Sequence, residues 1–86
     1  MRFMIKANLK EPPTEEVLAL VPAEQARSQE LADQGIREAL YVAADQSVVW
    51  YIWNCESQDA LEEIHKTLPL HDYLNTEITL LSDDGF

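Results

Sequence analysis

The chain has 86 residues, 47% of them apolar, and a formal net charge of −10. This apolar content excludes a disordered chain, and the length predicts one domain, residues 1–86, with a thin core. Only six basic side chains stand against sixteen acidic ones, which argues against nucleic acid as a partner, because phosphate binding relies on Lys and Arg.

The sequence also carries no signs of a membrane or secreted protein. No apolar run approaches the roughly 20 residues that a membrane-spanning helix needs. The N-terminus does not read as a signal peptide, and the lone Cys55 cannot form an internal disulfide. We therefore expect a cytoplasmic protein with no membrane partner. His65, His71 and Cys55 lack a recognisable metal-ligand spacing, so we expect no metal site.

Residues 2–9 alternate between apolar and mixed positions, which predicts a strand. Phe3 and Ile5 share one face of this strand, and Lys6 and Asn8 share the other.

A helical region follows, to about Gln34. Thr14, with two glutamates after it, is a good helix start, and Gly35 is a natural stop. Pro22 lies inside the region, so we expect either a kink or two consecutive helices.

Two further strands are predicted next. The period changes to two from Ile36, and residues 47–55 form the most β-prone run of the chain. Asp45-Gln46 could form the turn of a hairpin that joins these two strands. Trp50 and Trp53 must lie on opposite faces of their strand, so one of them packs under the helices.

The C-terminal third predicts a helix and a strand joined by a corner. Ser57 is of a residue type preferred at the N-cap of a helix, and residues 73–82 alternate again. Between them, Leu68-Pro69-Leu70 stops the helix, because proline cannot continue it, and delivers His71 and Tyr73 to the corner. His65, beside charged neighbours, is expected to be a solvated helix residue.

The predicted order is strand, helix, strand, strand, helix, strand. This is the α+β, ferredoxin-like βαββαβ arrangement, with a four-stranded antiparallel sheet and both helices on one face. The uncovered face would be too apolar to remain in water, which predicts a homodimer whose two sheets form a barrel. In this prediction Lys6, Asn8, Tyr41 and Tyr51 point into or beside the enclosed space. The residues assigned to the uncovered face are Met4, Lys6, Arg37, Tyr41, Val49, Tyr51 and Trp53.

A set of residues spread over nearly the whole chain resembles the muconolactone isomerase family of the dimeric α+β barrel superfamily. The strongest element is Leu68-Pro69-Leu70 followed by Tyr73. The others are Phe3, Lys6, a proline soon after the first strand, Glu24, Leu31 before Gly35, Leu40, and Ser57 with Ala60-Leu61. The resemblance implies a proton shift in a small carboxylated lactone from aromatic degradation. It further implies that no cofactor is needed and that the enzyme forms a higher homo-oligomer.

Three residues are candidates for the catalytic chemistry. A proton shift beside a carbonyl needs a base, an acid and a donor to the developing negative charge. Lys6 could pair with an anionic substrate or, if desolvated, act as a base. Glu24, on a helical stripe of leucines, would have a raised pKa. Tyr51 could donate a hydrogen bond to a carbonyl oxygen.

A second set of residues is expected to bind the substrate. Arg37, with Lys6, could supply the local positive charge that an anionic substrate needs in an acidic protein. Tyr41 could donate a hydrogen bond, and His71 titrates near neutral pH at the corner. The full set is Asn8, Arg37, Tyr41, Trp53, His71 and Tyr73.

Three functions remain open from the sequence. The first is a cofactor-independent, muconolactone-type isomerase acting on a small, anionic ring compound. The second is a cofactor-free monooxygenase or cyclase on an aromatic substrate, which the bulky Val49, Tyr51 and Trp53 would suit. The third is a non-catalytic ligand-binding or assembly module of the same fold.

Overall fold

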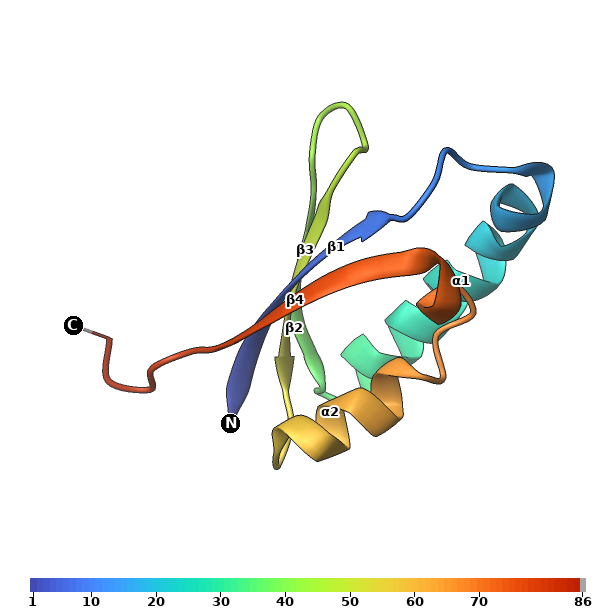
Figure 1. The fold of residues 1–86 in the computed structure, drawn as a ribbon. Helices are drawn as coiled ribbons and strands as arrows, with labels where there is room; N and C mark the ends of the chain where they lie inside the picture. Colours follow the sequence, from blue (N-terminus) through green and yellow to red (C-terminus); the bar gives the residue numbers. More distant parts are fainter. Residues whose placement is uncertain (86) are drawn as a thin grey trace.

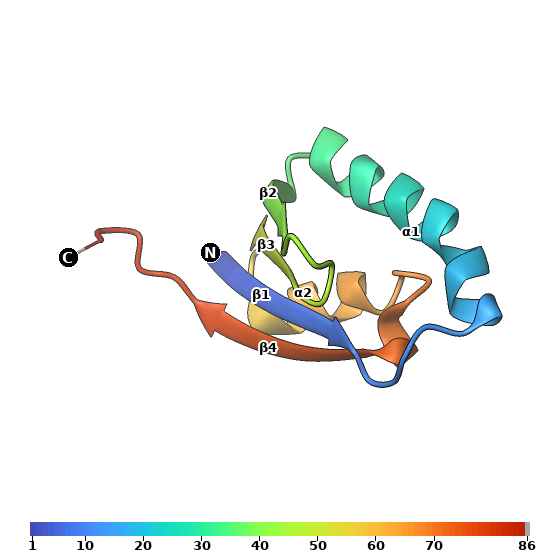
Figure 2. The same ribbon diagram turned by 90° about the horizontal axis from the view of Figure 1, so that it is seen from above.

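The computed structural model describes residues 1–85 and contains a four-stranded antiparallel sheet with two helices. The strand order is β2-β3-β1-β4, and both helices lie on the same side of the sheet (Figures 1 and 2). The predicted α+β, ferredoxin-like arrangement is therefore confirmed. The elements are β1 (Arg2–Leu9), α1 (Glu15–Asp33), β2 (Arg37–Val42), β3 (Val49–Asn54), α2 (Gln58–His65), the 3₁₀ helix η1 (His71–Tyr73) and β4 (Leu74–Leu80).

The helix starts and stops follow local chemistry. The Thr14 hydroxyl accepts a hydrogen bond from the Val17 N–H at 3.2 Å, and the Ser57 hydroxyl caps α2 in the same way. Gly35 ends α1 with a φ of 80°, a conformation that residues with a Cβ rarely adopt. Of the two alternatives for Pro22, two consecutive helices are wrong: α1 continues through Pro22 as one helix. No helix within residues 1–85 is long and apolar enough to span a bilayer.

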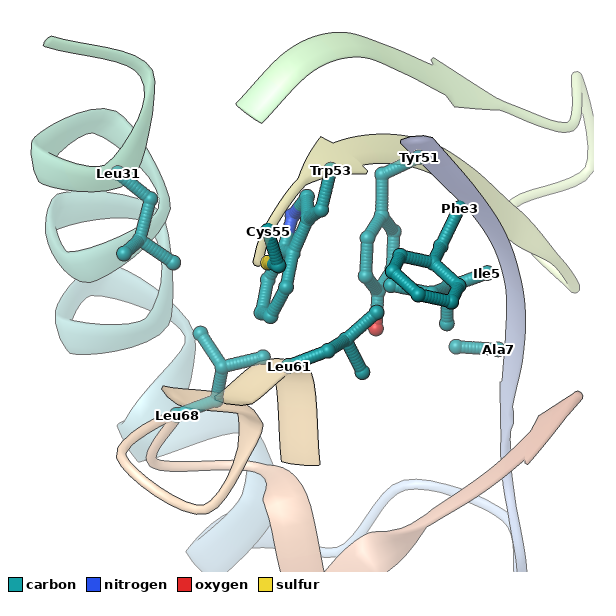
Figure 3. Packing of buried hydrophobic residues seen from close by; sticks show 9 residues of the cluster. All are labelled: Phe3, Ile5, Ala7, Leu31, Tyr51, Trp53, Cys55, Leu61 and Leu68. Atoms are coloured by element: carbon teal, nitrogen blue, oxygen red, sulfur yellow. The ribbon is translucent and has the colours of Figure 1, made fainter. Parts of the chain in front are cut away.

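The core lies between the sheet and the helices. Phe3 and Ile5 of β1 are buried there beside Tyr51 and Trp53 of β3, and Leu31 closes the core from α1. Figure 3 shows Tyr51 and Trp53 pointing from β3 into this layer. The core therefore fills one face of the sheet only.

This packing corrects the predicted face of β3. Tyr51 and Trp53 do share a face, but it is the helix-covered face, because they pair with Ile5 and Phe3 across the sheet. A strand that is apolar on both sides gives no signal of which side is inward. Trp50 takes the uncovered face, opposite Lys6.

Arg37 was also assigned to the wrong face. The pairing of β2 with β3 shifts between Arg37 and Ala39, where β2 has one extra residue. Beyond such a bulge, the residues that would have pointed to one face of the sheet point to the other. Arg37 is therefore opposite Trp53 on the helix side, whereas Tyr41 is opposite Trp50 on the uncovered side.

Candidate functional site

A cavity of about 420 Å³ lies between α1 and the helix-covered face of the sheet. This volume is in the range of small-molecule sites, and the walls are mainly apolar, as is usual for such sites. The apolar wall comes from β2, β3 and the corner after α2: Leu40, Val42, Val49, Leu68 and Leu70. Polar groups enter from α1, β2 and β3, and these groups determine the chemistry that the cavity can support.

Glu24 projects from α1 and lines this cavity. Its Oε1 accepts a hydrogen bond from the Leu70 N–H at 2.9 Å. That N–H is available because Pro69 has stopped the helical pattern, so it lacks a helical acceptor. Burial raises the pKa of the Glu24 carboxyl, and the hydrogen bond from Leu70 partly opposes this rise. A carboxyl with a raised pKa binds a proton more strongly than an exposed one, which suits a group that accepts a proton and returns it.

Tyr51 lines the cavity from β3, and its hydroxyl begins a chain of hydrogen bonds. The hydroxyl lies 2.6 Å from His65 Nε2, and His65 Nδ1 lies 2.9 Å from His71 Nδ1. Burial and the nearby Glu24 charge raise the pKa of Tyr51, so its hydroxyl stays protonated and can donate. Burial and the neighbouring His71 lower the pKa of His65 to about 4, so this ring is neutral at physiological pH.

Arg37 carries the only positive charge among the cavity-lining residues within 1–85. Its Nη1 donates a hydrogen bond of 2.6 Å to the Ser28 hydroxyl of α1, which fixes the guanidinium across the gap between helix and sheet. A guanidinium presents several N–H donors, so it can hold Ser28 and a ligand carboxylate together.

Four of the nine predicted site residues meet at this cavity. They are Glu24, Arg37, Tyr51 and Trp53, from three different elements. Trp53 is 2% exposed and forms part of the cavity wall as well as of the core.

Three other predicted site residues lie on the opposite face of the sheet. Lys6 and Asn8 line a separate hollow of about 270 Å³, and Lys6 Nζ is 3.9 Å from Glu77 Oε2. Tyr41 is 61% exposed on the same face. The structure therefore does not bring Lys6 and Glu24 to a common site within one chain.

The two remaining predicted residues lie at the corner. His71 contacts His65 rather than the cavity. The Tyr73 hydroxyl donates a 2.9 Å hydrogen bond to Glu16 Oε1, which raises the pKa of Tyr73 and directs it toward the start of α1. Tyr73 thus ties the corner to α1.

His65 was predicted wrongly as a solvated residue; it is 4% exposed. A signal was present in the sequence, because Leu61, His65 and Leu68 are spaced by four and three residues and so share one helical face. Two further contributions to the site were missed. Ser28 is a polar helix residue of a kind usually found exposed, so nothing in the sequence marked it as part of the site. The Leu70 N–H is a backbone group, which side-chain patterns do not reveal.

Comparison with known proteins identifies the fold and the family. The family model for muconolactone delta-isomerase matches residues 1–84. The crystal structure of a muconolactone isomerase is similar, with 25% identity, a TM-score of 0.82, and coverage of 94% of this chain and 88% of that chain. No curated protein gives a significant match.

Two more solved structures share the fold. One is the 5-chloro-2-hydroxyhydroquinone dehydrochlorinase of Burkholderia phenoliruptrix AC1100, in complex with 2,5-dihydroxybenzoquinone. It has 15% identity and a TM-score of 0.75, with coverage of 95% of this chain and 94% of that chain. The other is a Mycobacterium tuberculosis protein with 18% identity, a TM-score of 0.53 and coverage of 95% of each chain. Because the family model spans residues 1–84, the chain belongs to the muconolactone delta-isomerase family.

Proposed function

We propose that this protein is a cofactor-independent isomerase that moves a proton within a small, anionic ring compound such as a carboxylated lactone. The observation that carries the proposal is the position of Glu24, a partly buried carboxyl at an apolar cavity that it shares with Tyr51 and Arg37. Family membership and the likeness to a muconolactone isomerase support the same reaction type.

In the proposed reaction Glu24 acts as the base. The ionised carboxylate removes a proton from a carbon next to the substrate carbonyl, and the resulting carboxylic acid returns the proton to another carbon of the conjugated system. The same group can perform both transfers, because the proton moves within one bound molecule. The Leu70 N–H holds one carboxylate oxygen in place and leaves the other for the substrate.

Tyr51 and Arg37 have complementary roles in this proposal. The Tyr51 hydroxyl donates to the carbonyl oxygen, where negative charge develops as the carbon loses its proton. Arg37 binds the substrate carboxylate and so offsets the repulsion from a protein of net charge −10. Trp53 provides a flat apolar wall for the ring.

We also propose that the working protein is a cytoplasmic homodimer that takes part in aromatic catabolism. Trp50 and Ile52 of β3 lie on the face of the sheet that the helices leave uncovered, beside Met4 of β1. A second copy that packs its own sheet on this face would remove these apolar side chains from water. Dimerisation would leave the cavity on the helix side of each chain.

A second candidate is a cofactor-free monooxygenase or cyclase on an uncharged aromatic compound. The apolar lining by Leu40, Val42 and Val49 favours it, because these side chains offer no partner to a charged ligand. The two candidates differ in their need for Arg37, which an uncharged substrate does not use.

Incubation of the purified protein with muconolactone, followed by proton NMR, tests the main proposal. Glu24→Gln keeps the side-chain volume but removes the base, so kcat/KM should fall by about 100-fold or more. Glu30→Gln is the matched control, because Glu30 lies on the same helix, paired with Arg27 and 61% exposed. Its activity should equal that of the wild type. Equal activity of Glu24→Gln and Glu30→Gln, or no turnover at high wild-type concentration, would contradict the proposal.

A further inference from the structure

Two hydrogen bonds connect Tyr51, at the cavity, through His65 to His71. We propose that Tyr51, His65 and His71 form a proton relay between the cavity and solvent. This inference rests on the proposed function, in which Tyr51 donates to the substrate oxygen.

The geometry supplies an unbroken path. Tyr51 lines the cavity at one end, and the two contacts that follow, 2.6 Å from Tyr51 to His65 and 2.9 Å from His65 to His71, are both hydrogen-bond distances. The middle ring, His65, is 4% exposed and packs against the aromatic rings of Tyr51 and Trp53. Water is therefore excluded from the centre of the path, and the proton must pass through the imidazole.

The far end of the path meets solvent. Within residues 1–85, His71 uses its Nδ1 for His65, and its Nε2 has no hydrogen-bond partner. No buried side-chain nitrogen or oxygen in that range lacks a partner, so this unpaired Nε2 is accessible to water. His71 is half-buried, in η1, directly after the corner.

Two arrangements, each with three protons, fit this series of hydrogen bonds. In the first, His71 Nδ1–H donates to His65 Nδ1, and His65 Nε2–H donates to the Tyr51 oxygen, so the Tyr51 O–H is free to donate into the cavity. In the second, Tyr51 O–H donates to His65 Nε2, and His65 Nδ1–H donates to His71 Nδ1, while His71 carries its proton on Nε2. In both arrangements each of the two hydrogen bonds that link the three side chains has one donor and one acceptor.

Passing from the first arrangement to the second delivers one proton to the substrate oxygen. Tyr51 gives its proton to that oxygen and receives one from His65 Nε2; His65 Nδ1 receives one from His71 Nδ1. Water then supplies a proton to His71 Nε2 and becomes hydroxide. When Glu24 returns its proton to carbon, the enol O–H gives its proton back to Tyr51, and each transfer reverses. The relay is therefore reset in every turnover, with no net consumption of protons.

Two substitutions of His71 separate a relay from a structural role. His71→Asn keeps a polar atom near the position of Nδ1 and can still hydrogen-bond to His65, but an amide does not pass a proton on. His71→Leu removes both the hydrogen bond and the transfer. The relay predicts that both variants lower kcat about tenfold or more, with little change in KM. Wild-type kcat in His71→Asn together with a loss in His71→Leu would show a purely structural contact and overturn the relay.

Nitrogen-15 NMR of the two imidazoles tests the relay without any substrate. Protonated His71 can only donate from Nδ1, so it forces His65 into the form with its proton on Nε2. The same spectra report when His71 carries protons on both ring nitrogens, and in that state the Nε2–H fraction of His65 should rise while His65 stays neutral. The groups that face His65 are Tyr51 from β3 and His71 from η1, with Glu24 of α1 beyond Tyr51.

In His71→Leu the His65 tautomer should no longer change as the pH is lowered. Unchanged tautomer fractions in the wild type, or protonation of His65 together with His71, would overturn the relay. This result is independent of turnover. A protein with the tautomer coupling but no activity on muconolactone would refute the proposed substrate and retain the relay.

Discussion

At Glu24, burial and one backbone hydrogen bond act in opposite directions on the carboxyl. Burial raises its pKa, and the Leu70 N–H, which favours the ionised form, limits the rise. A base must be ionised at working pH and still bind a proton strongly enough to remove it from carbon. The corner that contains Leu70 therefore limits how far burial raises the pKa of the proposed base.

At His65, the cost of burial should appear as a pH-dependent stability. Its pKa is lowered from 6.5 to about 4 in the folded protein, so between these values the unfolded chain binds a proton that the folded chain does not. The part of the stability that depends on neutral His65 is fully present above pH 6.5 and is lost as the pH falls toward 4. From pH 7 to pH 5 we expect the free energy of unfolding to fall by about 1–2 kcal/mol through His65.

Urea unfolding of the wild type and of His65→Gln at pH 7 and pH 5 measures this loss. The raised pKa of Glu24 acts with the opposite sign, but it contributes to both proteins, so the difference between their pH dependences isolates His65. His65→Gln should lose less stability on acidification than the wild type. The same loss in both proteins would show that His65 is protonated as readily when folded as when unfolded.

At the scale of elements, the corner from Leu68 to Leu70 joins the core to the site. Leu68 is 5% exposed and belongs to the core, while Leu70 lies along the cavity and donates to Glu24. Tyr73, three residues after the corner, holds the end of η1 against α1 through Glu16. These contacts fix α1 against the segment that precedes β4, so the position of Glu24 depends on both.

The positions of the strands and helices along the chain were predictable from local signals. The side of the sheet to which the residues of a strand point was not. Caps at Thr14 and Ser57 and the stop at Gly35 act within a few residues, and each appears where its chemistry predicts. The bulge after Arg37 depends on the partner strand, and β3 is apolar on both sides. A pattern in one strand cannot reveal either property.

The candidate site was predictable only in part for the same reason. Glu24 was identified from its helical stripe, and Tyr51, Trp53 and Arg37 were identified by type but placed on the wrong face. The Tyr51–His65 contact joins residues 14 positions apart, on different elements. It arises from tertiary packing, and neither residue signals the other in sequence.

At the scale of the whole molecule, the sheet has one covered and one uncovered face. The uncovered face carries Met4, Trp50 and Ile52 of the central strands β1 and β3. The cavity is on the covered side, so the two faces can serve separate purposes: assembly on one and chemistry on the other.

Sedimentation velocity should find the wild-type protein as a dimer or a higher assembly of dimers. Ile52→Asp places a charge in the middle of the uncovered face, where its desolvation in a sheet-to-sheet contact is unfavourable, and should give monomers. Leu18→Asp is the control, because Leu18 is 57% exposed on α1, away from this face. A monomeric wild type at tens of micromolar, or a dimeric Ile52→Asp variant, would contradict the assembly.

In the proposed function the ligand binds on the helix side of the sheet, beside Glu24. Each face has one tryptophan, so the two indole N–H signals report the two faces separately: Trp53 the cavity and Trp50 the uncovered face. The direct measurement is a titration of nitrogen-15-labelled protein with muconolactone, following both indole signals and the Leu70 amide. We predict saturable shifts of the Trp53 indole and of the Leu70 amide, whose hydrogen Glu24 accepts, with little change at Trp50. Shifts confined to Trp50, with Trp53 and Leu70 unchanged, would contradict the account.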